Sequence, residues 1–204
     1  MKKLSEKSYW DSIYQKLPIQ EKNSKSALSY IKDILKNLTR DYSNYVLWEV
    51  LCKKYLPYSK TYKVVEVGCA PGKYLINFHN TFGYIPYGVE YSEKGVEVTK
   101  ENFKQAQLNL DGVIYADFFD SVFQNIHKEQ YDVVFSRGFV EHFDDVPRVI
   151  ALHNNLLRSG GYVVIMIPNL SGINKLLAKF LNKSLKNGIT WLELVITCSM
   201  VKRV

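Results

Sequence analysis

The chain has 204 residues, 47% hydrophobic and 23% charged, which fits one α/β domain with a small extension and excludes disordered or collagen-like classes. The formal net charge of +7 is uneven, being +6 over residues 1–62, −4 over residues 63–169 and +5 over residues 170–204. Because the central segment is acidic, a nucleic-acid groove through it is disfavoured.

Residues 1–62 are predicted to form an N-terminal helical extension that packs on the core. Apolar residues of its second helix recur at the spacing of one helix face, and prolines separate the elements. The expected helices lie near Ser5–Leu17, Ser26–Arg40 and Tyr42–Leu56.

Residues 63–169 alternate between short β-rich runs and helical patterns. The runs lack strict polar alternation, which is typical of a mainly parallel, doubly wound sheet covered on both faces. Ser92 is the expected N-cap of the second helix, and Gly160 and Gly161 are expected to end the third. The predicted strands are YKVVEV, IPYGVE, GVIYAD, YDVVFS and GGYVVIMIP, and the predicted helices are Gly72–Phe82, Ser92–Leu108 and Val146–Arg158.

Residues 170–204 are predicted to start with a basic amphipathic helix, Ser171–Asn187, which ends at Gly188. One strand, such as Trp191–Cys198, can follow it. No apolar run in the chain reaches the length of a membrane span, and the N-terminus lacks the apolar stretch of a secretory signal. We therefore expect a cytoplasmic protein.

The three cysteines are odd in number and far apart, which fits neither a disulfide framework nor a zinc site. Cys69 has no histidine near it in the sequence. A small residue beside Gly68 is therefore favoured over a nucleophile.

The stretch KVVEVGCAPGK, residues 63–73, joins a buried strand to a glycine-rich turn. Glycine leaves bare backbone where a ligand can approach, and a helix that starts after Gly72 points free amides to the same place. This pattern predicts a nucleotide-type cofactor site. Dinucleotide sites place glycines at the first, third and sixth positions, whereas Gly68 and Gly72 are four apart, so NAD is disfavoured.

The pattern Glu66-x-Gly68-x-x-x-Gly72 resembles the first motif of class I S-adenosylmethionine-dependent methyltransferases. Further motifs follow in the family's order over about residues 62–169, down to the turn LRSGGYV. The resemblance implies a Rossmann-like fold, S-adenosyl-L-methionine as cofactor and methyl transfer as activity. In the family this strand acid contacts the region of the methionine amino group and the loop makes room for methionine and ribose, which implies cofactor contacts for Glu66, Gly68, Cys69, Ala70 and Gly72.

Later strand ends supply the other implied cofactor residues. Glu90 can accept hydrogen bonds from both ribose hydroxyls, and Tyr91 resembles the side chain that flanks adenine. Asp117 and Phe118 resemble the position that meets the adenine amine, although an aspartate at a strand end is more often a loop-starting residue. Ser136 stands where the family's fourth strand runs beside the transferring methyl group.

His142, in the pair Glu141-His142 after the fourth strand, is the candidate catalytic base. A neutral imidazole near pH 7 could remove a hydroxyl proton, but a structural histidine bonded to the backbone is an equal alternative. Ubiquinone-type O-methyltransferases carry a glutamate three residues before a similar pair, where this chain has Gly138. We therefore expect no metal at this position.

The methyl acceptor stays open between a small molecule, a saccharide and a lipid-like compound, methylated on oxygen or nitrogen. The Asn-Pro-Pro-aromatic stretch of nucleic-acid amino-methyltransferases is missing after the fourth strand. Family members usually end with a helix and an antiparallel strand pair, for which residues 170–204 are too few, so we expect a short member with an incomplete pair. A catalytically impaired, methyltransferase-like binding module is the main alternative, and an NAD-dependent oxidoreductase is the weaker one.

Overall fold

The computed structural model describes residues 11–12, 42–167 and 198–203. The chain divides into two compact units. One unit contains Leu56–Ile165 with Met1–Ile19 and Met200–Val204, and the other contains Gln20–Tyr55 and Met166–Ser199. The predicted helices Ser26–Arg40 and Ser171–Asn187 lie outside the described residues, as does most of the predicted strand Trp191–Cys198.

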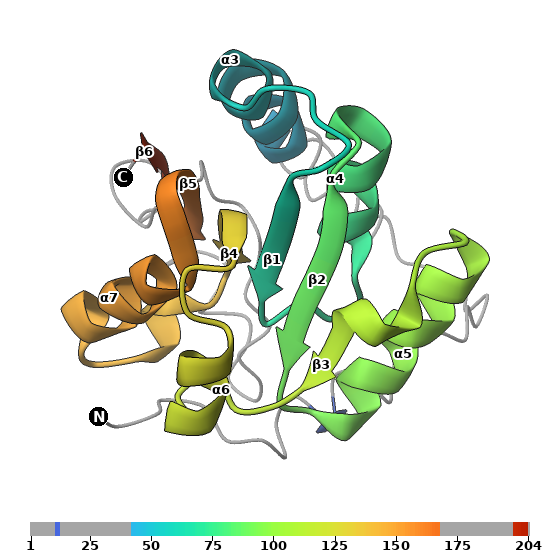
Figure 1. Ribbon diagram of the computed structural model, residues 1–204, viewed down its shortest axis with the longest axis vertical. Helices are drawn as coiled ribbons and strands as arrows, with labels where there is room; N and C mark the ends of the chain where they lie inside the picture. The colour runs from blue at the N-terminus through green and yellow to red at the C-terminus, as the bar shows by residue number, and fades with distance from the viewer. Residues whose placement is uncertain (1–10, 13–41, 168–197, 204) are drawn as a thin grey trace, which may run out of the picture. The chain divides into compact units, whose positions relative to one another are not determined.

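A six-stranded sheet in the order β3-β2-β1-β4-β5-β6 forms the centre of the fold (Figure 1). β1 pairs in parallel with β2 and β4, and β2 pairs in parallel with β3. Because the order reverses at β1, the sheet is doubly wound, as predicted. The strands are β1 (Lys63–Val67), β2 (Ile85–Glu90), β3 (Val113–Tyr115), β4 (Tyr131–Arg137), β5 (Leu157–Ile167) and β6 (Cys198–Arg203).

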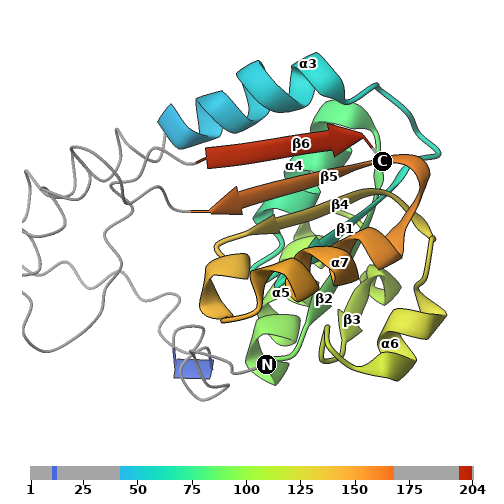
Figure 2. The ribbon, with the colours of Figure 1, turned by 90° about the vertical axis from the view of Figure 1, so that its left-hand side faces the viewer.

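Helices cover both faces of this sheet, with α7 in front and α4 behind in the view of Figure 2. α4 (Lys73–Phe82) packs on β1 and β2, α5 (Glu93–Gln105) packs on β2 and β3, and α7 (Val146–Leu156) packs on β4. A short helix, α6 (Ser121–Ile126), contacts α7. The two layers of helices explain why the strands are apolar without strict alternation.

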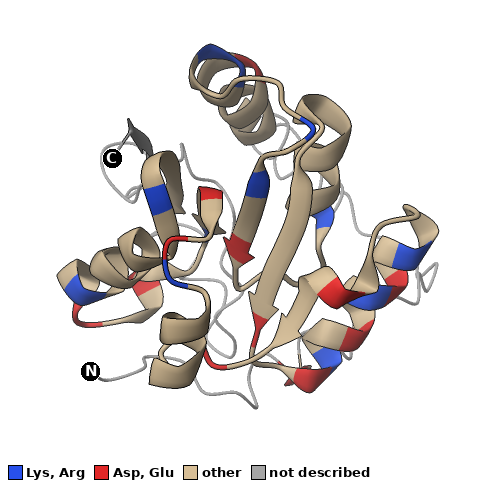
Figure 3. Ribbon diagram, viewed as in Figure 1, with Lys and Arg blue, Asp and Glu red and all other residues tan. Residues whose placement is uncertain are grey.

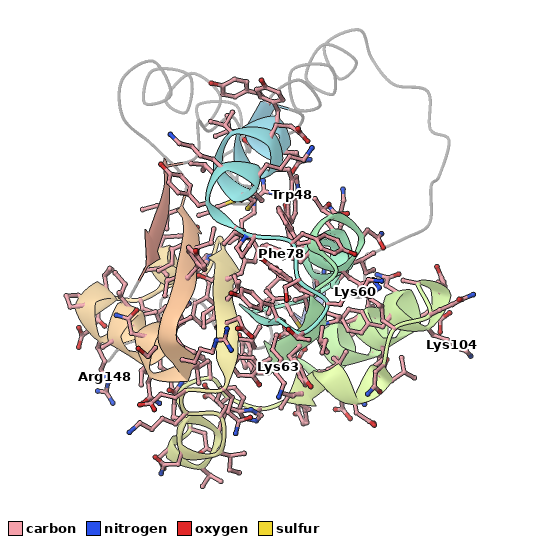
Figure 4. All side chains as sticks on the ribbon, turned by 45° about the horizontal axis from the view of Figure 1, so that its top comes forward. Trp48, Lys60, Lys63, Phe78, Lys104 and Arg148 are labelled. Carbon is pink, nitrogen blue, oxygen red and sulfur yellow. The ribbon has the colours of Figure 1, made fainter. Side chains whose placement is uncertain are left out.

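The core lies on both faces of the central strands. Val65 and Val134 belong to a buried cluster with Val149 and Leu156 of α7. On the opposite face, Phe78 of α4 packs its ring 5.3 Å from that of Phe135, and Figure 4 shows Phe78 in the interior. Burial of each such side chain stabilises the fold by about 1.5–3 kcal/mol.

The predicted start of the second helix at Ser92 is confirmed, whereas the predicted end of the third helix is wrong. Ser92 caps α5 by accepting a hydrogen bond from Gly95 N at 3.1 Å. α7 ends at Leu156, two residues before the predicted Arg158. Leu157 is buried in the core cluster as the first residue of β5, and Arg158 forms an ion pair with Asp132 of β4. Strand pairing therefore overrides the local helical pattern, and Gly160, with φ of 78°, lies inside β5.

Helix α6 was not predicted. It is short, and Val122 and Ile126 on it are exposed while Phe123 is buried, so its apolar residues do not mark one inward face. Its N-cap, Asp120, accepts a hydrogen bond from Val122 N.

In the second unit, residues 42–55 are helical, as predicted, and include a π-helical segment, η1 (Val46–Cys52), followed by α3 (Lys53–Tyr55). Lys53 and Glu49 form an exposed ion pair one turn apart, at 2.7 Å. The packing of residues 1–62 on the core stays a prediction. No helix within the described ranges is long and apolar enough to cross a membrane.

Candidate functional site

A cavity opens where β1 to β4 end, at the point where the strand order reverses. Ligands of doubly wound sheets bind at this position. Figure 3 shows acidic residues at the ends of β1 and β2 near it. The cavity brings together seven of the eleven residues predicted from the sequence: Gly68, Ala70, Glu90, Tyr91, Asp117, Phe118 and His142.

Gly68 forms the turn that follows β1. Its φ of 72° lies in the left-handed region, and its backbone N–H donates to the Val89 carbonyl at 2.9 Å. A Cβ atom at this position would lie 3.1 Å from Cδ2 of Phe139. Glycine is therefore required both by the backbone conformation and by the close approach of an aromatic ring.

Glu90 ends β2 with a carboxylate that is only 3% exposed. Its Oε1 accepts from Ser92 N at 2.9 Å, and its Oε2 accepts from Ala70 N at 3.4 Å. Burial raises the pKa of this carboxyl, and the backbone N–H donors partly offset the effect. Each carboxylate oxygen can accept a second hydrogen bond, so the group can still receive ligand hydroxyls.

Glu66 is buried in β1 and does not line the cavity. Within the described part of the chain, its Oε2 has no hydrogen-bond partner. Burial raises the pKa of Glu66 well above the usual value, the positive charge of Arg137 opposes this, and the charge of Glu90 adds to it. A buried carboxylate oxygen without a hydrogen-bond donor is costly to the folded state.

Cys69 and Gly72 serve packing and do not line the cavity. Cys69 is buried against Gly88, where a Cβ atom would lie 2.5 Å from its Sγ. Burial, followed by the charges of Glu66 and Glu90, raises the pKa of this thiol well above its usual value, which disfavours a nucleophilic thiolate. At Gly72, a Cβ atom would lie 2.8 Å from Cγ2 of Thr99 in α5.

Ser136 also lies outside the cavity lining. It is completely buried, and its Oγ is 3.0 Å from Nε2 of His153 in α7. The sequence offered no sign of this pair, because the two residues are 17 positions apart on different elements.

His142 lines the cavity from η3 (Val140–His142), the short 3-10 helix after β4. Burial lowers the pKa of this imidazole, and a hydrogen bond with the backbone of Gly138 works in the opposite direction. The neutral form therefore dominates near pH 7, which is the form that a base requires.

Asp117 and Phe118 line the cavity in different ways. Oδ1 of the exposed Asp117 accepts from Phe119 N at 3.0 Å, as in a turn. Phe118 is buried, and its ring lies 5.5 Å from that of Phe139. The loop-starting role proposed for Asp117 is thus present, and the residue also reaches the cavity.

An aromatic wall, defined by Phe119, Phe139 and Phe143, lines one part of the cavity and was not predicted. Phe143 lies 4.8 Å from Phe119 and 4.9 Å from Phe139, measured between ring centroids. Arg137 lines the cavity as well. The run of phenylalanines around the Glu141-His142 pair was the sequence signal that could have indicated this wall.

Asp11, from the start of the chain, reaches the same region. Its Oδ1 accepts a hydrogen bond from Ser92 Oγ. Its negative charge contributes to the raised pKa values of Glu90 and Tyr91, for both of which burial is the largest cause. Asp11 therefore adds a further carboxylate beside the site.

The described residues contain no group of three or more His, Cys, Asp or Glu side chains that could hold a metal ion. Glu141, beside His142, has a buried Oε2 without a hydrogen-bond partner among them, and burial raises the pKa of its carboxyl.

The family model described as "Methyltransferase domain" matches residues 10–195. The doubly wound fold, the cavity at the strand ends and this match define the class of the protein. The chain belongs to the methyltransferase-domain family.

Two similar proteins match about half of the chain. A protein named ubiquinone biosynthesis O-methyltransferase, from Shewanella sp. (strain ANA-3), is 27% identical over 107 residues, which are 52% of this chain and 44% of that protein. A protein of the same name from Pelagibacter ubique is 27% identical over 110 residues, which are 54% of this chain and 43% of that protein. The chain spans less than half the length of these relatives.

Solved structures support the fold. A proposed S-adenosylmethionine-dependent methyltransferase from Methanococcus maripaludis superposes with a TM-score of 0.52 at 19% identity, covering 82% of this chain and 74% of that one. Geranyl diphosphate C-methyltransferase from Streptomyces coelicolor A3(2) superposes with a TM-score of 0.51 at 17% identity, covering 66% and 50%. At these identities the likeness concerns the fold.

Proposed function

We propose that the protein binds S-adenosyl-L-methionine and transfers its methyl group. One observation carries the proposal: neighbouring parallel strands carry two buried carboxylates, Glu66 one residue before the end of β1 and Glu90 at the end of β2, and the left-handed turn at Gly68 follows β1 directly. The cofactor has hydrogen-bond donors in two separate places, namely the ribose hydroxyls and the methionine ammonium. Buried acids with spare acceptor capacity are suited to such donors.

The residues present fit the parts of this cofactor. Glu90 is suited to the ribose hydroxyls, Glu66 to the ammonium, and Tyr91 and Phe118 to the faces of adenine. Gly68 allows the ligand to approach the backbone closely. When bound, the cofactor supplies an electrophilic methyl group on sulfur, and the protein's task is to align the acceptor and exclude water.

We propose His142 as the general base for an acceptor that carries a proton. Its lowered pKa keeps the imidazole neutral near pH 7, and it lines the same cavity as Gly68 and Glu90. A base of this kind is suited to removing a proton from a hydroxyl during methyl transfer. This favours an oxygen acceptor over a nitrogen acceptor, and the names of the two curated relatives agree with that preference.

The acceptor that fits best is a small molecule with an apolar body. The aromatic wall is suited to an apolar or ring-bearing compound. A lipid-like acceptor matches it better than a saccharide does, and nucleic acid stays disfavoured. A cytoplasmic location remains a prediction from the sequence.

Calorimetry with S-adenosylhomocysteine tests the proposal. The wild type is expected to bind it and not to bind NAD. Glu90→Ala is expected to lose about tenfold or more in affinity, because charge-assisted hydrogen bonds contribute about 1.5–3 kcal/mol each. Glu101→Ala, a change at an exposed acid of α5, is the control and is expected to bind like the wild type.

Two results would overturn the proposal: no binding of S-adenosylhomocysteine by the folded wild type, or unchanged affinity in Glu90→Ala. Circular dichroism checks the fold, and Glu90→Gln, which keeps the side-chain size, gives a second measurement. A screen of metabolites with cofactor labelled at the methyl group then identifies the acceptor. A wild type that binds but methylates nothing in the screen would favour the binding-module alternative.

A further inference from the structure

Arg137 and Glu66 lie on the same face of the sheet. Side chains alternate along a strand, so Arg137 projects to the same side of β4 as Phe135, and Glu66 is the register partner of Phe135 on β1. Tyr74 of α4 confirms this side, because its ring lies 5.5 Å from that of Phe135 and 5.0 Å from the guanidinium carbon of Arg137. The cation and the carboxylate are therefore diagonal neighbours on the face that α4 covers.

The charges of the two residues interact. The positive charge of Arg137 lowers the pKa of Glu66, against the larger effect of burial. Arg137 lines the cavity and is the one lysine or arginine among the described residues that do so, whereas Glu90 and Asp117 line it at the ends of β2 and β3. The cavity is thus acidic toward β2 and β3 and basic at the tip of β4.

A ligand group that complements Arg137 and Glu66 together must carry both a negative and a positive charge. An anion bound to Arg137 alone would lie near the buried carboxylate of Glu66, which would repel it. A cation bound to Glu66 alone would lie near the guanidinium. The amino-acid end of a ligand avoids both penalties, because its ammonium and carboxylate are attached to one carbon.

We propose that Arg137 binds the α-carboxylate of the cofactor's methionine while Glu66 receives the α-ammonium. This inference rests on the proposed function. A guanidinium offers a planar pair of donors that matches a carboxylate, and the Tyr74 ring supports it from the α4 side. Arg137 is then a specificity-determining residue, which distinguishes the intact cofactor from analogues that lack the carboxylate.

The test compares two ligands by calorimetry: S-adenosylhomocysteine and its decarboxylated form, which keeps the amine and the adenosine. Arg137→Gln is expected to weaken S-adenosylhomocysteine about tenfold or more and to leave the affinity for the amine within about twofold. Glu66→Gln is expected to weaken both ligands, because both retain the ammonium. Arg148→Gln is the control, since Arg148 lies on the outer side of α7 (Figure 4) and is exposed.

The outcomes separate this inference from the proposed function. If the wild type binds neither ligand, both the function and the inference are overturned. If the wild type binds S-adenosylhomocysteine and Arg137→Gln binds it equally well, or loses both ligands equally, the inference alone is overturned. Retained binding of the amine in Arg137→Gln also shows that the variant is folded, and Arg137→Lys is expected to give an intermediate loss.

Discussion

Ser136 Oγ lies 3.0 Å from His153 Nε2, and both side chains are completely buried beneath the cavity wall. His153 Nδ1 lies 2.8 Å from the Val149 carbonyl, which can only accept, so Nδ1 carries the proton. Because burial lowers the pKa of His153 to about 4, the imidazole is neutral near pH 7, and Nε2 accepts the hydrogen bond of the Ser136 hydroxyl. Its ring also lies 4.9 Å from that of Phe118, so the pair supports a residue that lines the cavity.

This pair predicts a loss of stability in acid. Burial lowers the pKa of His153 from 6.5 to about 4. The unfolded chain binds the proton more readily, so the stabilisation is complete above pH 6.5, falls as the pH is lowered toward 4, and changes no further below that. The loss in the free energy of unfolding that His153 alone contributes is expected to be about 3 kcal/mol. Urea unfolding at several pH values across this range measures it.

Other buried groups also titrate as the pH is lowered, so the effect of His153 must be isolated by comparing the wild type with a variant that lacks it. Burial raises the pKa values of Glu66, Glu90 and Glu141, and such carboxyls act in the opposite direction as the pH falls. The prediction therefore concerns the difference in stability between the wild type and His153→Leu, which should shrink on acidification. A difference that stays constant with pH would contradict it.

A second prediction concerns the hydrogen bond itself. Ser136→Ala and His153→Leu each leave one buried polar group without a partner, at a cost of about 1–3 kcal/mol. The double variant removes both groups, so its loss should be smaller than the sum of the single losses by about 1 kcal/mol or more. Urea unfolding near neutral pH measures this cycle. Additive losses would show that the contact contributes no coupling energy.

The third prediction compares two left-handed glycines. Gly160, with φ of 78°, has nothing within 4 Å of where a Cβ atom would be, whereas Gly68, with φ of 72°, faces Phe139. Alanine at either position costs about 1–2 kcal/mol from the backbone alone. Gly68→Ala should destabilise more than Gly160→Ala and should weaken binding of S-adenosylhomocysteine, and Gly68→Val should abolish binding. Normal binding by Gly68→Val would show that the turn does not face the ligand.

The fourth prediction is that Gly95→Ala changes the stability of the protein in the direction opposite to the one that helix propensity predicts. Alanine in place of a helical glycine usually stabilises by about 1 kcal/mol. At Gly95 in α5, however, a Cβ atom would lie 2.9 Å from Cγ of Glu90 and 3.0 Å from Cβ of Ala70. Gly95→Ala should therefore destabilise the protein, by about 1–3 kcal/mol, and weaken cofactor binding by displacing Glu90. Thermal unfolding and calorimetry check it, and a stabilised variant with full affinity would be contrary evidence.

The fifth prediction addresses His142. With an acceptor from the screen, His142→Gln should lower turnover about a hundredfold while S-adenosylhomocysteine affinity changes little. Because burial lowers the pKa of His142, the acid limb of the rate profile should lie below pH 6.5. His79→Gln, at an exposed histidine of α4, is the control. Unchanged turnover in His142→Gln would leave His142 a structural residue.

The elements whose signals are local could be predicted from the sequence alone. The apolar runs of β1 and β4, the N-cap at Ser92 and the glycine turn at Gly68 are all where the pattern predicted them. These signals depend on neighbours a few residues apart, so no knowledge of long-range contacts was needed. The same applies to Glu90, because the carboxyl ends of parallel strands meet at one edge of a sheet.

Which side chains of each motif face the cavity depends instead on contacts between elements. Gly72 and Cys69 belong to the same motif as Gly68, yet they pack against α5 and β2, because the turn after β1 directs successive residues to different neighbours. Arg137 and His153 acquire their partners, Glu66 and Ser136, from other elements. Leu157 begins a strand because its side chain joins the core cluster. Contacts between elements far apart in the chain set these outcomes, and a single sequence carries no local record of them.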